Sequence, residues 1–178
     1  MDIHDNELSW LSDDAGEIDG FGGNFGFFNN YVHDVFDGLS LAPLRGGPAY
    51  VFKNRFAHLH RMQPMGWSEG TVIKSGANSD GLCYFFHNSI WSPPKNGATT
   101  NGISVWASGY GPKFRLWNNA ISVSRWAISS GGTSGDYDIL WSTDPTRLWE
   151  DGVRTGNIAA LQAYGYERNG YQVAPGFA

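Results

Sequence analysis

The chain is poor in the residues that define several common protein classes. Cys83 is the single cysteine among 178 residues, which excludes an internal disulfide framework and a metal site built from cysteines alone. Charged residues make up only 16%, a low share for a helical protein. No apolar run approaches the roughly 18 residues of a membrane helix, and Met1 is followed by neither a basic nor an apolar segment. We therefore expect no membrane partner and no signal peptide in this sequence.

Positive charge is missing from the first quarter of the chain. Residues 1–44 contain nine Asp or Glu and no Lys or Arg, and the net charge of the whole chain is -5. Proteins that bind nucleic acids carry a basic stripe that neutralises phosphates, so this distribution predicts no nucleic-acid partner. An acidic end of this kind suits cations, sugar hydroxyls or simple solvation.

Glycine, aromatic residues and a recurring asparagine are what the chain has instead. The 24 glycines and 8 prolines indicate many turns and few long helices, so the sequence predicts an all-β fold. An apolar residue, an asparagine three positions later and a second apolar residue two positions further recur at intervals of 24, 24, 34 and 31 residues. The five copies are Ile3/Asn6/Leu8, Phe27/Asn30/Val32, Val51/Asn54/Phe56, Phe85/Asn88/Ile90 and Leu116/Asn119/Ile121. A period of about 20–50 residues is typical of stacked repeats.

Asparagine suits a column of stacked repeats. Its amide can accept a hydrogen bond from one copy and donate to the next, and it tolerates the left-handed backbone of a tight corner. The repeat therefore predicts an asparagine ladder, a structural role favoured over ligand binding. Asp138 stands where a further asparagine would be expected, so we expect the ladder to end there.

This pattern resembles the right-handed parallel β-helix family, the pectate-lyase-like fold. The tail is similar to the C-terminal closure of secreted members, in Asp136–Trp141 and in a helix-like stretch from Asn157 to about Tyr164. The resemblance implies about five to six rungs over residues 1–145 and a closure over residues 146–178 with a short capping helix. Since Asn6 already occupies the repeat position, we expect earlier rungs or another subunit to cover the open N-terminal end. As part of a longer secreted chain, the protein would be extracellular or periplasmic.

The resemblance also implies a polysaccharide ligand and lyase-type cleavage of an acidic polysaccharide. The segment around Lys74 is similar to the lysine-containing segment of alginate and chondroitin lyases, in which lysine removes a proton next to the uronate carboxyl group. That role requires a lowered lysine pKa. Arg61, His58, His60 and His87 are the candidates that would lower it and stabilise the resulting anion. A glycoside hydrolase is less favoured because the characteristic motif of polygalacturonases is missing.

Two further groups complete the candidate site. The candidate substrate-binding residues are Trp106, Asp37 and Glu69. Asp37 directly precedes Gly38, Glu69 directly precedes Gly70, and Trp106 lies on the predicted strand after Gly102. Calcium is a candidate cofactor at Asp13, Asp14, Glu17 and Asp19, because clustered carboxylates suit this ion. A solvated acidic loop explains the same cluster.

A function without catalysis is the alternative. In that case the chain is a glycan-binding module, or a structural or adhesion module, and outward aromatic side chains form the working surface. The candidates are Phe28, Phe52, Phe86 and Trp117. This hypothesis predicts exposed aromatic rings and no lysine with a perturbed pKa.

Overall fold

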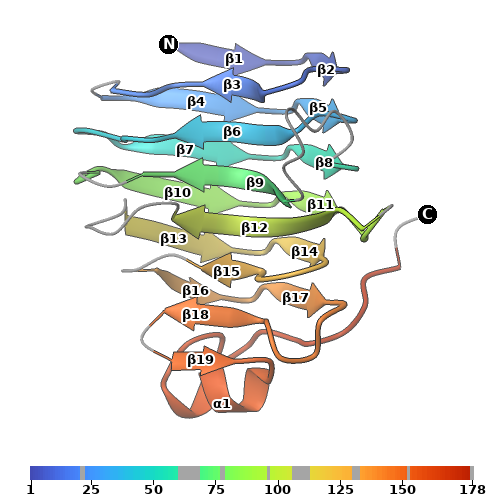
Figure 1. The fold of residues 1–178 in the computed structure, drawn as a ribbon. Helices are drawn as coiled ribbons and strands as arrows, with labels where there is room; N and C mark the ends of the chain where they lie inside the picture. The colour runs from blue at the N-terminus through green and yellow to red at the C-terminus, as the bar shows by residue number, and fades with distance from the viewer. Residues whose placement is uncertain are drawn as a thin grey trace.

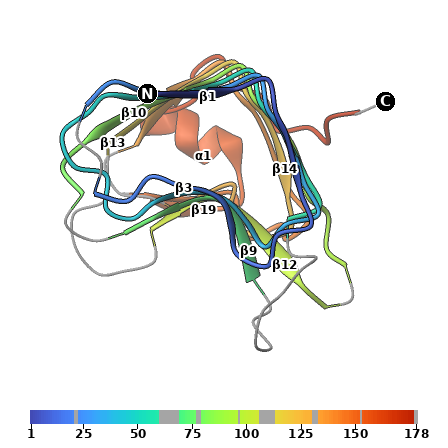
Figure 2. The same ribbon diagram turned by 90° about the horizontal axis from the view of Figure 1, so that it is seen from above.

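Three parallel sheets make up almost the whole molecule. The structure is a computed structural model and describes residues 1–20, 23–59, 69–76, 79–95, 97–105, 113–129, 133–151 and 153–176. The chain passes through the three sheets one after another, and each complete passage forms one turn of the chain. The strands of successive turns stack side by side (Figure 1). Seen along the stack, the strands of each sheet superimpose and the three sheets surround a common interior (Figure 2). The predicted all-β fold is confirmed. Within the described residues, no helix is long and apolar enough to cross a membrane.

Each sheet takes every third strand. Sheet A consists of β1 (Asp2–His4), β4 (Phe25–Phe28), β7 (Ala49–Phe52), β10 (Leu82–Phe86), β13 (Lys113–Trp117) and β16 (Ser134–Asp136). Sheet B consists of β2 (Glu7–Ser9), β5 (Tyr31–His33), β8 (Arg55–Ala57), β11 (Ser89–Trp91), β14 (Ala120–Val123) and β17 (Ile139–Ser142). Sheet C consists of β3 (Asp14–Glu17), β6 (Asp37–Leu41), β9 (Glu69–Ser75), β12 (Thr99–Val105), β15 (Ile128–Ser129), β18 (Trp149–Asp151) and β19 (Val153–Thr155). Only the last pair of sheet C, β18 and β19, is antiparallel among the described strands.

The register places the repeated apolar residues on top of one another. Phe27 is paired with Val51, Val51 with Phe85, and Phe85 with Leu116 across sheet A, and all four side chains are fully buried. Such columns form because successive strands lie about 4.8 Å apart and side chains alternate between the two faces of each strand. Cys83 is buried in the same core as a free thiol, and burial raises its pKa.

The predicted asparagine ladder runs along the corner between sheets A and B. The Nδ2 group of each asparagine donates to Oδ1 of the next, at 3.0 Å from Asn6 to Asn30 and 3.1 Å from Asn30 to Asn54. The column continues through Asn88 and Asn119, and Asn119 donates to Asp138 at 2.8 Å. The predicted ladder is confirmed, and Asp138 is the last member that the repeat contributes to it, as expected.

The left-handed residue of each corner is not the asparagine, as we had expected, but the residue before it. Positive φ angles occur at Asp5, Asn29, Lys53, His87, Asn118 and Tyr137. The asparagine itself has a different backbone conformation. In that conformation its backbone N–H group also donates to the next Oδ1, for example from Asn54 to Asn88 at 3.0 Å. This division of roles leaves one side chain per turn of the chain at the outer corner.

A short helix closes the end of the stack that carries the C-terminal residues. Helix α1 (Ile158–Ala163) begins after Asn157, whose side chain accepts from the Ala159 N–H group at 2.8 Å. Its Leu161 side chain is fully buried in the core, and the helix lies across the end of the three-sided stack (Figures 1 and 2). The capping helix predicted from Asn157 to about Tyr164 is confirmed.

Candidate functional site

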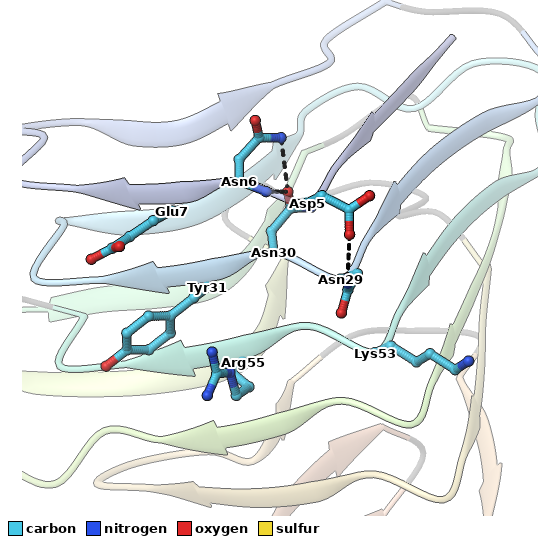
Figure 3. Close-up of a pocket in the computed structure, with 8 residues that line it drawn as sticks. All are labelled: Asp5, Asn6, Glu7, Asn29, Asn30, Tyr31, Lys53 and Arg55. Carbon is cyan, nitrogen blue, oxygen red and sulfur yellow. Dashed lines mark hydrogen bonds between the residues drawn. The ribbon is translucent and has the colours of Figure 1, made fainter.

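Two shallow hollows lie on the outside of the corner between sheets A and B. The first has a volume of about 460 Å³ and belongs to the first three turns of the chain (Figure 3). It is lined by Asp5, Asn6, Glu7, Asn29, Asn30, Tyr31, Lys53 and Arg55. The second has a volume of about 360 Å³ and belongs to the next three turns. It is lined by His87, Asn88, Ser89, Asn118, Asn119, Ala120, Tyr137 and Ile139. Every turn therefore contributes to one of the two hollows.

The carboxylates of the first hollow already have partners in the protein. Asp5 is hydrogen-bonded by His4 at 2.5 Å and by the Asn29 amide, and these two contacts lower the pKa of Asp5. Glu7 contacts Nε2 of His33 at 3.0 Å. Tyr31 stacks on His33 with 4.3 Å between ring centroids, and the Arg55 guanidinium lies 4.6 Å from the Tyr31 ring. The hollow thus offers polar groups of both signs beside an aromatic ring.

His33 is held between two acids. Its Nδ1 lies 2.9 Å from Asp34 and its Nε2 3.0 Å from Glu7. Burial alone would lower the pKa of His33, but the hydrogen bonds and charges of Asp34 and Glu7 outweigh it and raise the pKa. The imidazolium form is therefore favoured beside the first hollow.

One exposed aromatic side chain lines the second hollow, and another precedes one of its lining residues in the sequence. Tyr137 lines it and is 57% exposed, and Trp117, directly before Asn118, is 36% exposed. His87, a predicted catalytic residue, lies here and makes an edge contact with Phe86 at 5.5 Å. His87 and Lys74 therefore belong to different parts of the molecule, since Lys74 lies on sheet C. An aromatic border with amide groups is a surface suited to sugars.

The predicted outward aromatics form a column on sheet A. Parallel rings stack from His4 to Phe28, from Phe28 to Phe52 and from Phe52 to Phe86, with centroid distances of 4.7, 4.7 and 5.0 Å. Phe28, Phe52 and Phe86 are partly buried and lie outside the core cluster. Because their faces contact one another, these rings turn only their edges outward. The stack is therefore a scaffold feature. Trp117 stacks on Tyr84 with 6.0 Å between ring centroids but is 36% exposed, so it is the better surface for a ligand.

A second polar cluster brings together predicted residues from sheet C. Lys74 Nζ donates to Asp14 Oδ2 at 2.6 Å, although the two residues are 60 positions apart. Asp37 is paired with Asp14 in the sheet register and accepts from the Thr71 N–H group at 2.6 Å. The cluster combines the predicted base, one predicted substrate-binding residue and one predicted calcium ligand.

The charges of this cluster do not suit a catalytic base. Burial alone would lower the pKa of Lys74, but the hydrogen bond and charge of Asp14, with Asp37 and Asp13, raise it. Burial raises the pKa of Asp14 more than Lys74 lowers it. Burial, followed by the charge of Asp14, raises the pKa of Asp37 to about 7. The shift at Lys74 is opposite to the one that proton abstraction from a sugar requires.

Asp37 is also less accessible than its predicted role in substrate binding requires. The residue is 2% exposed, as part of a fully buried strand β6, and Asp14 and Thr71 contact it from the neighbouring strands. A direct contact between Asp37 and a polysaccharide is therefore incompatible with this arrangement.

The remaining predicted site residues are dispersed. Glu69 forms an ion pair with Arg125, and His58 contacts the Trp91 ring edge-on at 4.7 Å. Arg61, His60 and Trp106 lie outside the described residues. Within the described part of the chain, Glu69 and His58 have partners of their own and do not contact Lys74.

Two of the four acidic residues proposed for calcium have separate partners in the protein. Asp14 holds the Lys74 ammonium, while Asp19 accepts from Ser40 at 2.8 Å and from the Ala42 N–H group at 2.7 Å. Asp13 and Glu17 are exposed. No group of three or more His, Cys, Asp or Glu side chains arranged for a metal occurs among the described residues. Calcium at this cluster would have to displace Lys74 from Asp14.

Comparison with known proteins gives no further assignment. No family model matches the sequence, and searches of curated proteins and solved structures found no match.

The corner hollows were missed by sequence reasoning, although a signal existed. The signal was the residue directly before each ladder position. Its side chain differs from turn to turn, from Asp5 to Tyr137, while its φ angle is positive in every turn.

Proposed function

We propose that this chain is a right-handed parallel β-helix of the pectate-lyase-like type that binds a polysaccharide along the corner between sheets A and B without cleaving it. The order of strands through three parallel sheets and the asparagine ladder support the fold assignment. A regular stack presents similar groups once per turn, and a polymer of similar sugars can follow such a row.

The observation that carries the proposal is the pair of corner hollows, with the exposed Tyr137 in the second and the exposed Trp117 directly before its lining residue Asn118. Trp117 and Tyr137 can pack against the apolar face of a sugar ring, and the Asn118 amide can bond to its hydroxyl groups. The first hollow extends the same corner with Asn29, Lys53 and Arg55. A ligand several sugars long could contact both, because successive turns lie only about 4.8 Å apart.

Binding is favoured over cleavage because of the state of Lys74. A lyase base must lose its proton near neutral pH, whereas the contact with Asp14 at 2.6 Å favours the ammonium form. In the ammonium form the Lys74 nitrogen has no lone pair for proton abstraction.

The proposal is tested with the double variant Trp117→Ala/Tyr137→Ala and a panel of acidic and neutral polysaccharides. We expect at least one polysaccharide to bind the unchanged protein, with affinity reduced roughly tenfold in the variant, which corresponds to about 1.4 kcal/mol. Tyr164→Ala is the matched control, because Tyr164 is 67% exposed at the end of α1. Calorimetry or affinity electrophoresis measures the change.

Three results would overturn the proposal. They are the absence of binding across the panel, equal binding by the double variant and the unchanged protein, and formation of unsaturated uronate products, which absorb ultraviolet light. The last would restore the lyase hypothesis with Lys74 as base.

A further inference from the structure

The C-terminal tail inserts an acid into the end of the asparagine ladder. Glu167 follows α1 with a φ angle of +48°, and its side chain is fully buried. Its Oε2 accepts from the Asp138 N–H group at 3.2 Å, as Asp138 Oδ1 accepts from the Asn119 N–H group one turn earlier. Glu167 thus adds a further step to the ladder from outside the repeat.

Two glycines make room for this carboxyl group. A Cβ atom at Gly135 would lie 2.3 Å from Glu167 Oε1 and 3.1 Å from Asp138 Oδ2. A Cβ atom at Gly170 would lie 2.5 Å from Glu167 Oε2. The two carboxyl groups therefore share a small cradle beside Gly135 that side chains at either glycine would close.

The two carboxyl groups cannot both be ionised at low cost. Asp138 Oδ1 accepts from the Asn119 backbone at 2.7 Å and from its amide at 2.8 Å. Asp138 Oδ2 and Glu167 Oε1 are buried and have no donor among the described residues. Two buried carboxylates at close range repel each other and lack solvation. A single proton between these two oxygens supplies the missing donor and removes one charge.

The groups around the pair favour retention of that proton. Burial, with the charge of Asp138, raises the pKa of Glu167, and burial also raises that of Asp138. Asp136 on β16 adds to both effects, while Arg168 in the tail acts on Asp136. Helix α1 contributes the uncharged Gln162, which donates to the Glu167 carbonyl at 3.1 Å.

We propose that a proton shared by Asp138 and Glu167 fastens the C-terminal tail over the ends of sheets A and B, and that the tail opens as this proton is lost. Residues 166–172 are the segment concerned. The Glu167 N–H group donates to Gly135 at 3.0 Å, and Tyr171 both donates to Asp138 and accepts from Leu140 at 2.9 Å. Opening would release the proton to solvent and expose the edges of β16 and β17.

The direction of the pH effect follows from the two states. The opened tail exposes carboxyl groups of ordinary acidity, while the closed tail keeps the proton to higher pH. The closing contribution is therefore complete at acid pH and is lost as pH rises. Between about pH 6 and about pH 8, release of one proton on opening raises the opening constant by about tenfold for each pH unit.

Hydrogen exchange of residues 166–172 across this pH range tests the proposal, after correction for the intrinsic exchange rate. Glu167→Gln should abolish the pH dependence, because its amide donates to Asp138 without a titrating proton. Asp138→Asn provides a second variant with a donor at the same place. Glu150→Gln is the control, because Glu150 is partly exposed on β18 and pairs with Arg154.

The proposal is supported if the unchanged protein and Glu150→Gln show the rise and the two ladder-end variants do not. An opening constant that is independent of pH in the unchanged protein would overturn it. The same slope in Glu167→Gln and Asp138→Asn as in the unchanged protein would overturn it as well.

Discussion

Two buried acidic clusters, near opposite ends of the molecule, are neutralised in different ways. On sheet C, Asp14 and Asp37 lie close to the ammonium group of Lys74, which contacts Asp14 at 2.6 Å. At the end of the ladder, Asp138 and Glu167 have no basic side chain in contact among the described residues, and a shared proton takes the place of the cation.

The two clusters differ in their response to pH. A lysine supplies a fixed charge over the whole physiological pH range, so the contact between Asp14 and Lys74 acts as a permanent link between turns of the chain. A shared proton is exchangeable, so the link at the end of the ladder depends on pH. The first cluster stabilises the stack, and the second can control its closure.

An acid placed within the ladder, with neither a lysine nor a second carboxyl group, should be the most damaging change. In Asn88→Asp, position 88 loses the amide that donates to Asn119 at 3.1 Å and to Val51 at 3.0 Å. We expect a loss of about 3–5 kcal/mol in the free energy of unfolding near neutral pH, because an uncompensated charge is buried. Urea denaturation measures it.

Asp138→Asn is the control for that substitution, since it puts an amide where the ladder meets Glu167. We expect its free energy of unfolding at neutral pH to stay within about 1 kcal/mol of the unchanged protein. Equal losses in both variants would contradict the distinction between the interior of the ladder and its end.

Removal of the lysine from the first cluster should have the next largest effect. Lys74→Met leaves the Asp14 carboxylate without its cation, and the Asp14 side chain is only 6% exposed. Because Lys74 itself is 25% exposed, we expect a loss of about 2–3 kcal/mol in the free energy of unfolding near neutral pH, below the value for a fully buried pair. The loss should shrink in acid, where Asp14 takes up a proton.

Lys113→Met is the matched substitution, because Lys113 is an exposed lysine at the start of β13. A similar loss in both lysine variants would show that the contact between Lys74 and Asp14 contributes nothing specific.

The last prediction concerns a slope with pH rather than a loss at one pH, and it is the pH dependence due to Asp37. Its pKa is raised to about 7 in the folded chain, above its ordinary value. Its contribution to stability is therefore complete in acid and declines as pH rises from about 4 to about 7, by at most about 1.4 kcal/mol for each pH unit. Asp37→Asn should remove this slope, as measured by thermal unfolding over the pH series. Asp2→Asn, at an exposed acid of β1, should keep it.

The fold was predictable from the sequence where the repeat is local and regular. The spacing of Asn30, Asn54 and Asn88 fixes the stacking register, and Asn157 marks the start of the helix by its own side chain. The contact from Lys74 to Asp14 was not predictable, because it joins outer side chains 60 positions apart across turns of unequal length. Glu167 was missed for a related reason. It reaches the ladder from a non-repetitive segment 29 positions after Asp138.

The most direct test of this account is a carbon NMR titration of the individual side-chain carboxyl groups. The account predicts that Asp37 titrates at about 7 and that Glu167 holds its proton to well above the ordinary value of a glutamate. Titration of both groups near about 4, as for exposed carboxyl groups, would contradict the claim that one buried cluster is held by a lysine and the other by a proton.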